Sequence, residues 1–85
     1  MNLFFIERIV QKIKKDDIYN YAYTQGINLT NHELDTLYTY LKNYYKVFLR
    51  NQETRPKLLN EIKEQVSLEV ANKLDELYYQ YKDMI

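Results

Sequence analysis

One helix ends and the next begins within the stretch Gln25-Gly26-Ile27-Asn28-Leu29-Thr30-Asn31-His32-Glu33-Leu34. Gly26 suits the left-handed residue that follows a helix, because glycine adopts a positive φ at little steric cost. Thr30 can accept a hydrogen bond from the next turn while Glu33 accepts one from the Thr30 N–H, and Leu29 can pack on Leu34 as a hydrophobic staple. The stretch therefore predicts a junction between two helices. It predicts no chemistry, because its polar groups are engaged with the backbone.

The composition of the chain favours an all-α fold. Its 85 residues are enough for one small domain, residues 1–85, and its hydrophobic fraction of 46% beside 28% charged residues is typical of a folded protein. Glycine and proline occur once each, whereas a β-sandwich or barrel needs many tight turns. We expect a compact, single-domain bundle of about four to five short helices.

Apolar spacing and capping residues outline the first three helices. A first amphipathic helix is predicted over residues 3–14, with Ile6, Ile9, Val10 and Ile13 facing inward. A second, capped by Asp16 or Asp17 and ended by Gly26, should bury Ile18, Tyr21 and Ala22. The third should follow Thr30, bury Leu34, Leu37, Tyr38, Leu41 and Tyr45, and end between Asn43 and Lys46. Residues 47–49, Val-Phe-Leu, are then an apolar connector against the core.

Two further helices are predicted in the second half of the chain. Asn51 or Thr54 can open the fourth, and Thr54 is favoured because Pro56 then lies in the first turn, where a missing N–H is tolerated. Its inner face is Leu58, Leu59, Ile62 and Val66. Ser67 is expected to cap the fifth helix, whose inner face is Val70, Ala71, Leu74, Leu77, Tyr78 and Tyr81.

Compartment and membrane signals are few. The chain has no cysteine, and the apolar run at its start is broken by Glu7 and Arg8 too early for a signal peptide. No apolar run approaches the roughly 18 residues that span a bilayer. A cytoplasmic protein without a transmembrane segment is the expectation. The first helix could lie on an anionic membrane, but its apolar stripe is better explained as core.

Several capping and core residues together resemble a known family. The resemblance is carried by Asp16-Asp17-Ile18-Tyr19-Asn20-Tyr21-Ala22, Gly26-Ile27-Asn28-Leu29-Thr30, Tyr40-Leu41, Phe48, Arg55 and Leu58-Leu59-Asn60-Glu61-Ile62. In this order they resemble a small family of low-GC Gram-positive bacteria, the domain of unknown function 2624 (DUF2624), over nearly the whole chain. The chain departs from that family by its ten tyrosines. The resemblance implies a short, helical, cytoplasmic bacterial protein with no assigned activity, and so it transfers no functional residues.

A helix-turn-helix at residues 16–43 is one hypothesis for nucleic-acid binding. Ala22 and Gly26 have the spacing often seen in the first helix and turn of that motif. His32, however, occupies a position where the recognition helix expects a buried aliphatic residue. Glu33 and Asp35 open that helix with negative charge, which would repel phosphate. The motif is therefore degenerate.

The basic segment 42–57 gives the nucleic-acid hypothesis a second form. It carries five cations against one anion, interleaved with aromatic rings, as surfaces that stack on bases and contact phosphates do. The candidate contacts are Lys42, Tyr44, Lys46, Arg50, Arg55 and Lys57. The alternative is structural: aromatic residues such as Tyr45 belong to the core, and the lysines follow the dipole of a helix C-terminus. The chain as a whole has a net charge of zero, so it lacks the basic field typical of nucleic-acid binding.

Aromatic residues outside the inward stripes suggest a protein-contact surface. Tyr19 and Tyr23 lie four residues apart and face away from the predicted stripe of their helix, and Tyr79 and Phe4 are likewise off the inner faces. Tyrosine is enriched at interfaces because it supplies a large contact area at low entropic cost. The alternative is that a small domain covers both sides of a short helix, so that some of these rings are core.

Nothing in the sequence points to catalysis. His32 is the only histidine, and at the start of a capped helix it is expected to be solvated rather than a general base. We expect no catalytic residues, no cofactor and no metal, since the acidic residues have no His or Cys beside them to complete a site. The sequence therefore predicts a non-catalytic module that binds another protein or itself, including as a homodimer, with nucleic acid as the alternative partner.

Overall fold

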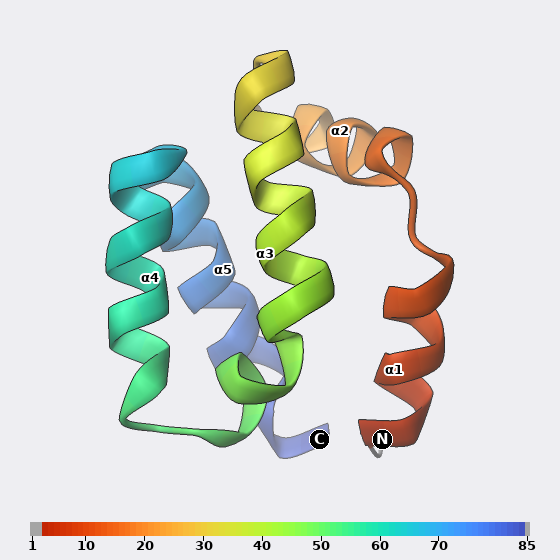
Figure 1. The fold of residues 1–85 in the computed structure, drawn as a ribbon, viewed down its shortest axis with the longest axis vertical. Coiled ribbons are helices and arrows are strands. Elements are labelled where there is room, and N and C mark those ends of the chain that lie inside the picture. The colour runs from red at the N-terminus through yellow and green to blue at the C-terminus, as the bar shows by residue number, and fades with distance from the viewer. Residues whose placement is uncertain (1–2, 85) are drawn as a thin grey trace.

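The computed structural model describes the backbone of residues 3–84 and the side chains of residues 6–83. Its helices are α1 (Leu3–Lys12), α2 (Lys15–Thr24), α3 (Asn31–Arg50), α4 (Thr54–Gln65), α5 (Leu68–Tyr81) and a terminal 3₁₀ turn, η1 (Lys82–Met84). The described residues contain no strand, which confirms the all-α prediction. Figure 1 shows α3 upright in the middle, the α4–α5 hairpin on one side of it, α1 on the other side, and α2 across the top.

The junction between α2 and α3 has the predicted geometry. Gly26 has a φ of 78°. The N–H of Ile27 donates to the carbonyl of Ala22 at 2.9 Å, and the N–H of Gly26 donates to the carbonyl of Tyr23 at 3.0 Å. These two bonds are the Schellman arrangement that ends helices in a left-handed residue. Glycine suits the end of α2 because it takes this left-handed conformation with less strain than residues that carry a Cβ.

Thr30 and Glu33 form the predicted capping box. The Glu33 N–H donates to the Thr30 hydroxyl at 3.1 Å, and the Thr30 N–H donates to the Glu33 carboxylate at 2.9 Å. Leu29 is buried, and Leu34 packs on the same core cluster. The start of α3 is thus fixed both by its polar cap and by an apolar contact, as the sequence predicts.

The core lies at the end of the bundle where α2, α3, α4 and α5 meet. Its buried residues are Ile18, Ala22, Leu29, Ile62, Val70 and Ala71. Half-buried leucines and tyrosines of α3 surround them. No described side chain is completely enclosed, which is expected for so short a chain because its surface is large relative to its volume.

α3 extends beyond its predicted end. We expected it to stop between Asn43 and Lys46 with residues 47–49 as a connector, but it continues to Arg50. The prediction was wrong because no glycine or proline interrupts this stretch, and Leu41, Tyr45 and Phe48 continue the helical spacing. The last turn is therefore stabilised by the same apolar stripe as the rest of the helix.

Two caps differ from the residues that the sequence favoured. Lys14 stands at the N-cap of α2, and the Asp17 carboxylate accepts its N–H at 2.8 Å from inside the first turn. For α4 the second of the two predicted residues is correct: the Asn51 side chain accepts the N–H groups of Glu53 at 3.0 Å and Thr54 at 2.9 Å, so Asn51 and not Thr54 caps the start of the helix. Asparagine reaches forward in this way readily, whereas Thr54 is already helical.

Other boundaries and caps were closer to prediction. The hydroxyl of Ser67 caps α5 by accepting the Val70 N–H at 3.1 Å, as predicted. Pro56 lies in the first turn of α4, where its missing N–H is tolerated. α1 ends at Lys12, two residues before its predicted end.

Three predicted inward residues are exposed. Ile9 of α1 is 49% exposed and Tyr21 of α2 is 46% exposed. α1 and α2 each pack mainly on α3, so only a narrow strip of each is covered, at Val10 and at Ile18 with Ala22. Tyr81 of α5 is 47% exposed for another reason, because it stands at the edge of a cleft.

Candidate functional site

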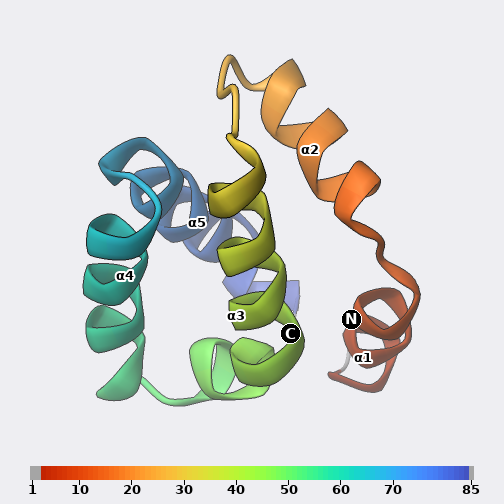
Figure 2. The same ribbon diagram turned by 45° about the horizontal axis from the view of Figure 1, so that its top comes forward.

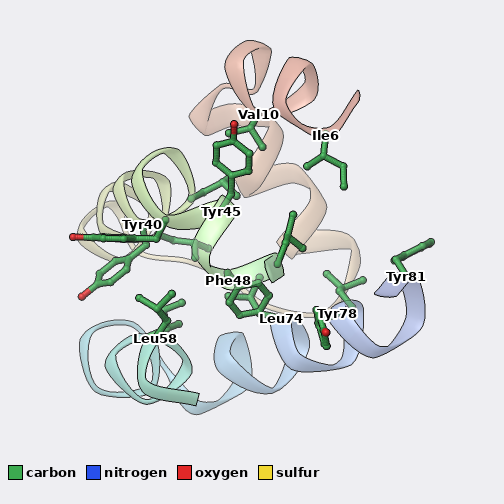
Figure 3. A pocket seen from close by; sticks show the side chains of 15 residues that line it. Ile6, Val10, Tyr40, Tyr45, Phe48, Leu58, Leu74, Tyr78 and Tyr81 are labelled. Carbon is green, nitrogen blue, oxygen red and sulfur yellow. The ribbon is translucent and has the colours of Figure 1, made fainter. Parts of the chain in front are cut away.

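An apolar cleft of about 350 Å³ opens between α1, α3, α4 and α5. Its lining consists of Ile6 and Val10 of α1; Leu37, Tyr40, Leu41, Tyr44, Tyr45, Phe48 and Leu49 of α3; Leu58 and Ile62 of α4; and Leu74, Leu77, Tyr78 and Tyr81 of α5. Figure 3 shows the α1 side chains on one side of the cleft and those of α4 and α5 on the other. The cleft is a small-ligand-sized space, within the range of about 300–1,000 Å³ found for binding pockets.

The lining offers almost no polar chemistry. Its only side-chain polar atoms are tyrosine hydroxyls, and two of these are directed away from the centre. The Tyr40 hydroxyl donates to Glu61 at 2.9 Å, and Figure 3 shows the Tyr45 hydroxyl directed toward α1. The hydrogen bond to Glu61 raises the pKa of Tyr40. The pKa of Tyr45 is raised mainly by desolvation of its hydroxyl and, to a smaller extent, by the negative charge of Glu7. Both hydroxyls stay neutral at physiological pH, so the cleft suits an apolar occupant.

The helical stripes of α3 and α5 explain the floor of the cleft. Leu37, Leu41 and Tyr45 follow one another at four-residue spacing along α3, so they share one face. Leu74 and Leu77 recur at helical spacing on α5. Both stripes were predicted to be core, but Leu37, Leu41, Tyr45, Leu74 and Leu77 line the cleft.

Polar contacts fix α1 at the edge of the cleft, where Figure 2 shows it standing beside α3. The ammonium group of Lys42 donates to the carbonyl of Val10 and, at 3.2 Å, to that of Gln11. These carbonyls belong to the last turn of α1, where backbone acceptors lack partners within the helix. Lys46 forms an ion pair with Glu7 at 3.3 Å. α1 is thus joined to α3 by two lysines, and among its described side chains only Val10 is buried.

Arg55 holds the opposite wall in place. Its side chain is buried at 8% exposure, its Nε donates to the Phe48 carbonyl at 2.6 Å, and its Nη2 donates to the Leu49 carbonyl at 3.1 Å. The guanidinium carbon lies 3.5 Å from the centre of the Tyr78 ring. The Phe48 ring meets Tyr78 edge to face, with ring centres 6.0 Å apart. Because Phe48 and Tyr78 line the cleft, Arg55 positions part of its wall.

Three of the five cations in the predicted basic segment 42–57 contact other parts of the same chain. Lys42, Lys46 and Arg55 have the partners described above, so their charges serve the fold. Arg50 and Lys57 are exposed. Tyr44 stands at the rim of the cleft, with its ring centre 5.5 Å from that of Tyr40. Binding of nucleic acid through residues 42–57 stays a prediction, with Arg50 and Lys57 as its most accessible cations.

The geometry around the α2–α3 junction differs from a helix-turn-helix. Six residues, 25–30, separate α2 from α3, whereas that motif joins its helices by a turn of about three or four. His32 is exposed in the first turn of α3, where solvation was expected. Among the described residues, no three His, Cys, Asp or Glu side chains come together as a metal site.

The four aromatic residues predicted as a protein-contact surface do not form one patch. Tyr19 is half-buried against the core, and its hydroxyl donates to the Asn28 side chain at 3.3 Å. Tyr23 is 66% exposed, and its ring stacks on that of Tyr19 with ring centres 6.4 Å apart. Tyr79 is 61% exposed but lies on another helix, α5. The side chain of Phe4 lies outside the described residues. The structure therefore brings together only the α2 pair.

Comparison with models of protein families, with curated proteins and with solved structures finds no significant match for this chain. The resemblance to the family of low-GC Gram-positive bacteria accordingly stays an expectation. None of the helices in the described part of the chain combines the length and the apolar character needed to cross a bilayer. The cleft is the site on which a functional argument can be built.

Proposed function

We propose that this chain is a non-catalytic binding module that receives apolar side chains of a protein partner in the cleft between α1 and α5. The observation that carries the proposal is the open cleft itself, lined by fifteen residues whose side chains are aliphatic or aromatic. An exposed apolar surface of this kind is typical of interaction sites, because leaving it in water is unfavourable.

The chemistry of the lining favours a protein partner over a polar metabolite. Sites for polar small molecules combine apolar walls with a few converging polar groups that orient the ligand. Here the Tyr40 hydroxyl is bonded to Glu61 outside the cleft, and no charged residue lines it. Grooves between helices that lack such groups accept the apolar face of a helix, with anchors three or four residues apart.

The rim supplies the residue types that dominate binding energy at interfaces. Tyr44 and Tyr81 are both exposed and both line the cleft. Tyrosine is over-represented among residues whose loss weakens binding most. The rim tyrosines thus take the interface role that the sequence suggested for tyrosines elsewhere.

Two substitutions on one helix test the proposal. Tyr81 lines the cleft and Tyr79 does not, yet both are exposed tyrosines of α5, so Tyr79→Glu is a matched control for Tyr81→Glu. Tagged wild type and both variants are used to capture proteins from a native extract treated with nuclease. A partner retained by wild type and Tyr79→Glu but lost with Tyr81→Glu supports the cleft. Equal retention by all three proteins contradicts it, and selective loss with Tyr79→Glu assigns binding to the other face of α5.

A further inference from the structure

We infer that α1 is a lid on the cleft. In this structure α1 stands open, and it closes by tilting about its C-terminal end until Ile6 contacts α5. The ion pair between Glu7 and Lys46 is the latch that holds α1 open on α3. The inference rests on the proposed function, since it names a control of access to the same site. It is carried by the uneven attachment of α1, the exposure of the latch and the apolar character of both faces of the cleft.

The attachment of α1 is concentrated at its C-terminal end. Val10 is buried, and the ammonium group of Lys42 donates to two carbonyls of the last turn. Directly after the helix, Ile13 packs against the core cluster. Nearer the N-terminus, Ile9 is 49% exposed. A helix rises about 1.5 Å per residue, so a tilt about Val10 moves the backbone of Leu3, about 10 Å away, much more than it moves the last turn.

The connector between α1 and α2 has the properties of a hinge. It consists of residues 13–14, and the backbone of Lys14 is extended, with φ −111° and ψ 164°. Figure 2 shows this stretch running between the two helices outside either of them. Hinges are typically a few residues at the ends of elements that absorb the change in backbone angles. Because the Asp17 carboxylate holds the Lys14 N–H, the start of α2 stays in place while α1 tilts.

The latch is a weak contact. The Glu7 and Lys46 side chains are 32% and 56% exposed, and their charged groups lie 3.3 Å apart. Exposed ion pairs contribute little to stability and are screened by salt. The pair joins α1 to α3 and not to α5, so it opposes a tilt toward α5. A small change in conditions or contacts therefore shifts the balance between the open and the closed position.

Both faces that would meet on closure are apolar. Ile6 of α1 lies on one side of the cleft, with Leu77 and Tyr81 of α5 on the other (Figure 3). Closure removes this apolar surface from water, which is favourable, and it buries no charge because the lining residues carry none. The apolar side chains of a partner would occupy the same space and hold α1 open. Empty and loaded clefts thus favour different positions of one helix.

Paramagnetic broadening measured by NMR tests the inference on the purified protein. The chain has no cysteine, so Gln80→Cys carries a single nitroxide on the exposed surface of α5. The methyl groups of Ile6 and Ile13 then report the two ends of α1. Removing the latch by Glu7→Gln should increase the closed population, and with it the broadening of Ile6, by about 1.5- to fivefold, the range expected for loss of an exposed ion pair. Ile13 should be unaffected.

Matched variants separate the latch from general effects of charge. Glu64→Gln removes the same charge from an exposed glutamate of α4 and should leave Ile6 unchanged. Lys46→Gln removes the latch from the side of α3, and the double variant with Glu7→Gln should show no more broadening than either single variant. Salt at about 1 M should raise the broadening of Ile6 in the Gln80→Cys protein that retains Glu7 and Lys46, but not in Glu7→Gln. Circular dichroism melts establish that each variant is folded.

Three results overturn the inference. Broadening of Ile6 that is the same with and without the latch shows that the ion pair does not hold α1 open. Broadening that falls in Glu7→Gln shows that α1 moves away from α5. An equal rise at Ile6 and Ile13 shows that α1 shifts as a whole, without a hinge.

The lid and the proposed function fail separately. Broadening that ignores the latch, together with capture of a protein that depends on Tyr81, removes the lid but leaves the cleft as a protein-binding site. Broadening that depends on the latch, together with capture that is unaffected by Tyr81→Glu, supports the movement of α1 and removes the protein partner.

Discussion

The guanidinium carbon of Arg55 lies 3.5 Å from the centre of the Tyr78 ring, while the same side chain donates two hydrogen bonds to the end of α3. One buried cation therefore joins the C-terminal end of α3 to the last turn of α5. Its charge is stabilised by carbonyls that have no partner within the helix and by the negative face of an aromatic ring. A residue that looks like a nucleic-acid contact in the sequence is thus part of the wall of the cleft.

Replacing Arg55 by lysine should destabilise the fold by about 2–3 kcal/mol. Lysine keeps the charge but cannot reproduce the planar fork that reaches Phe48 and Leu49 together, and buried hydrogen bonds to charged groups are each worth about 1.5–3 kcal/mol. Urea denaturation measures the free energy of unfolding. Arg50→Lys is the matched control, since Arg50 is exposed and its replacement should change stability by about 0.5 kcal/mol or less. Equal stability of the two variants would show that Arg55 does not hold α3 on α5.

Replacing Thr30 by alanine should destabilise the fold by about 0.5–2 kcal/mol, because the Glu33 N–H loses its acceptor. Thr39→Ala is the control within the same helix, since the Thr39 hydroxyl only donates to the carbonyl of Asp35 one turn earlier. Alanine has the higher helix propensity, so Thr39→Ala should be neutral or slightly stabilising. Thermal melts compare the two. The cap is refuted if Thr30→Ala melts at the wild-type temperature.

Replacing Gly26 by alanine should cost about 1–2 kcal/mol through the backbone alone. A Cβ built at Gly26 meets nothing within 4 Å, so the cost comes from the φ of 78° and not from crowding. Gly26→Asn should cost less, because asparagine tolerates the left-handed region better. Denaturant midpoints of the two variants provide the comparison, and an alanine variant as stable as wild type would contradict the Schellman ending.

The sequence predicted the ends of helices where the signal was local. Gly26, Thr30 and Ser67 cap by bonding to atoms within a few residues, so their geometry is contained in short stretches of chain. The end of α3 was predicted too early, between Asn43 and Lys46, although no glycine or proline interrupts the chain before Arg50. The apolar spacing of Tyr45 and Phe48 carries the helix onward, and tertiary packing decides such ambiguous turns.

The apolar periodicity of α3 and α5 does not predict the cleft. Periodicity identifies Leu77 and Tyr81 as residues on the inner face of α5, but it does not say whether a second face closes over them. That depends on where α1 lies, and α1 is placed by Lys42 through carbonyls 31 and 32 residues away along the chain. A surplus of apolar residues on α3 and α5 was the only available signal.

Binding of nucleic acid by the segment 42–57 makes a separate prediction. If it occurs, affinity should fall steeply with salt concentration, and replacing Arg50 and Lys57 by glutamine should reduce the slope by about one unit for each phosphate that is no longer neutralised. Fluorescence anisotropy with single-stranded and duplex oligonucleotides measures both quantities. Lys63→Gln and Lys73→Gln, outside the segment, serve as controls of equal charge change. Absence of binding at about 50 mM salt, where non-specific association is strong, would remove the hypothesis.

Replacing Lys42 by methionine should loosen α1 while leaving the rest of the bundle folded. The substitution keeps an unbranched, apolar side chain but removes the ammonium group that donates to Val10 and Gln11, so two carbonyls at the end of α1 lose their partner. Hydrogen exchange should become faster in α1 by about tenfold or more, which corresponds to a loss of about 1.4 kcal/mol in local stability.

Lys57→Met is the control for this measurement, because Lys57 is exposed on α4 and its loss should leave exchange in α1 unchanged. The position of α1 also bears on the cleft, since Ile6 and Val10 form one of its sides. If α1 is loosened, that side moves and binding in the cleft should weaken together with the protection of α1. Unchanged exchange in α1 of Lys42→Met would mean that apolar contacts around Val10 hold the helix by themselves, and that the lysine is not needed to keep the cleft in shape.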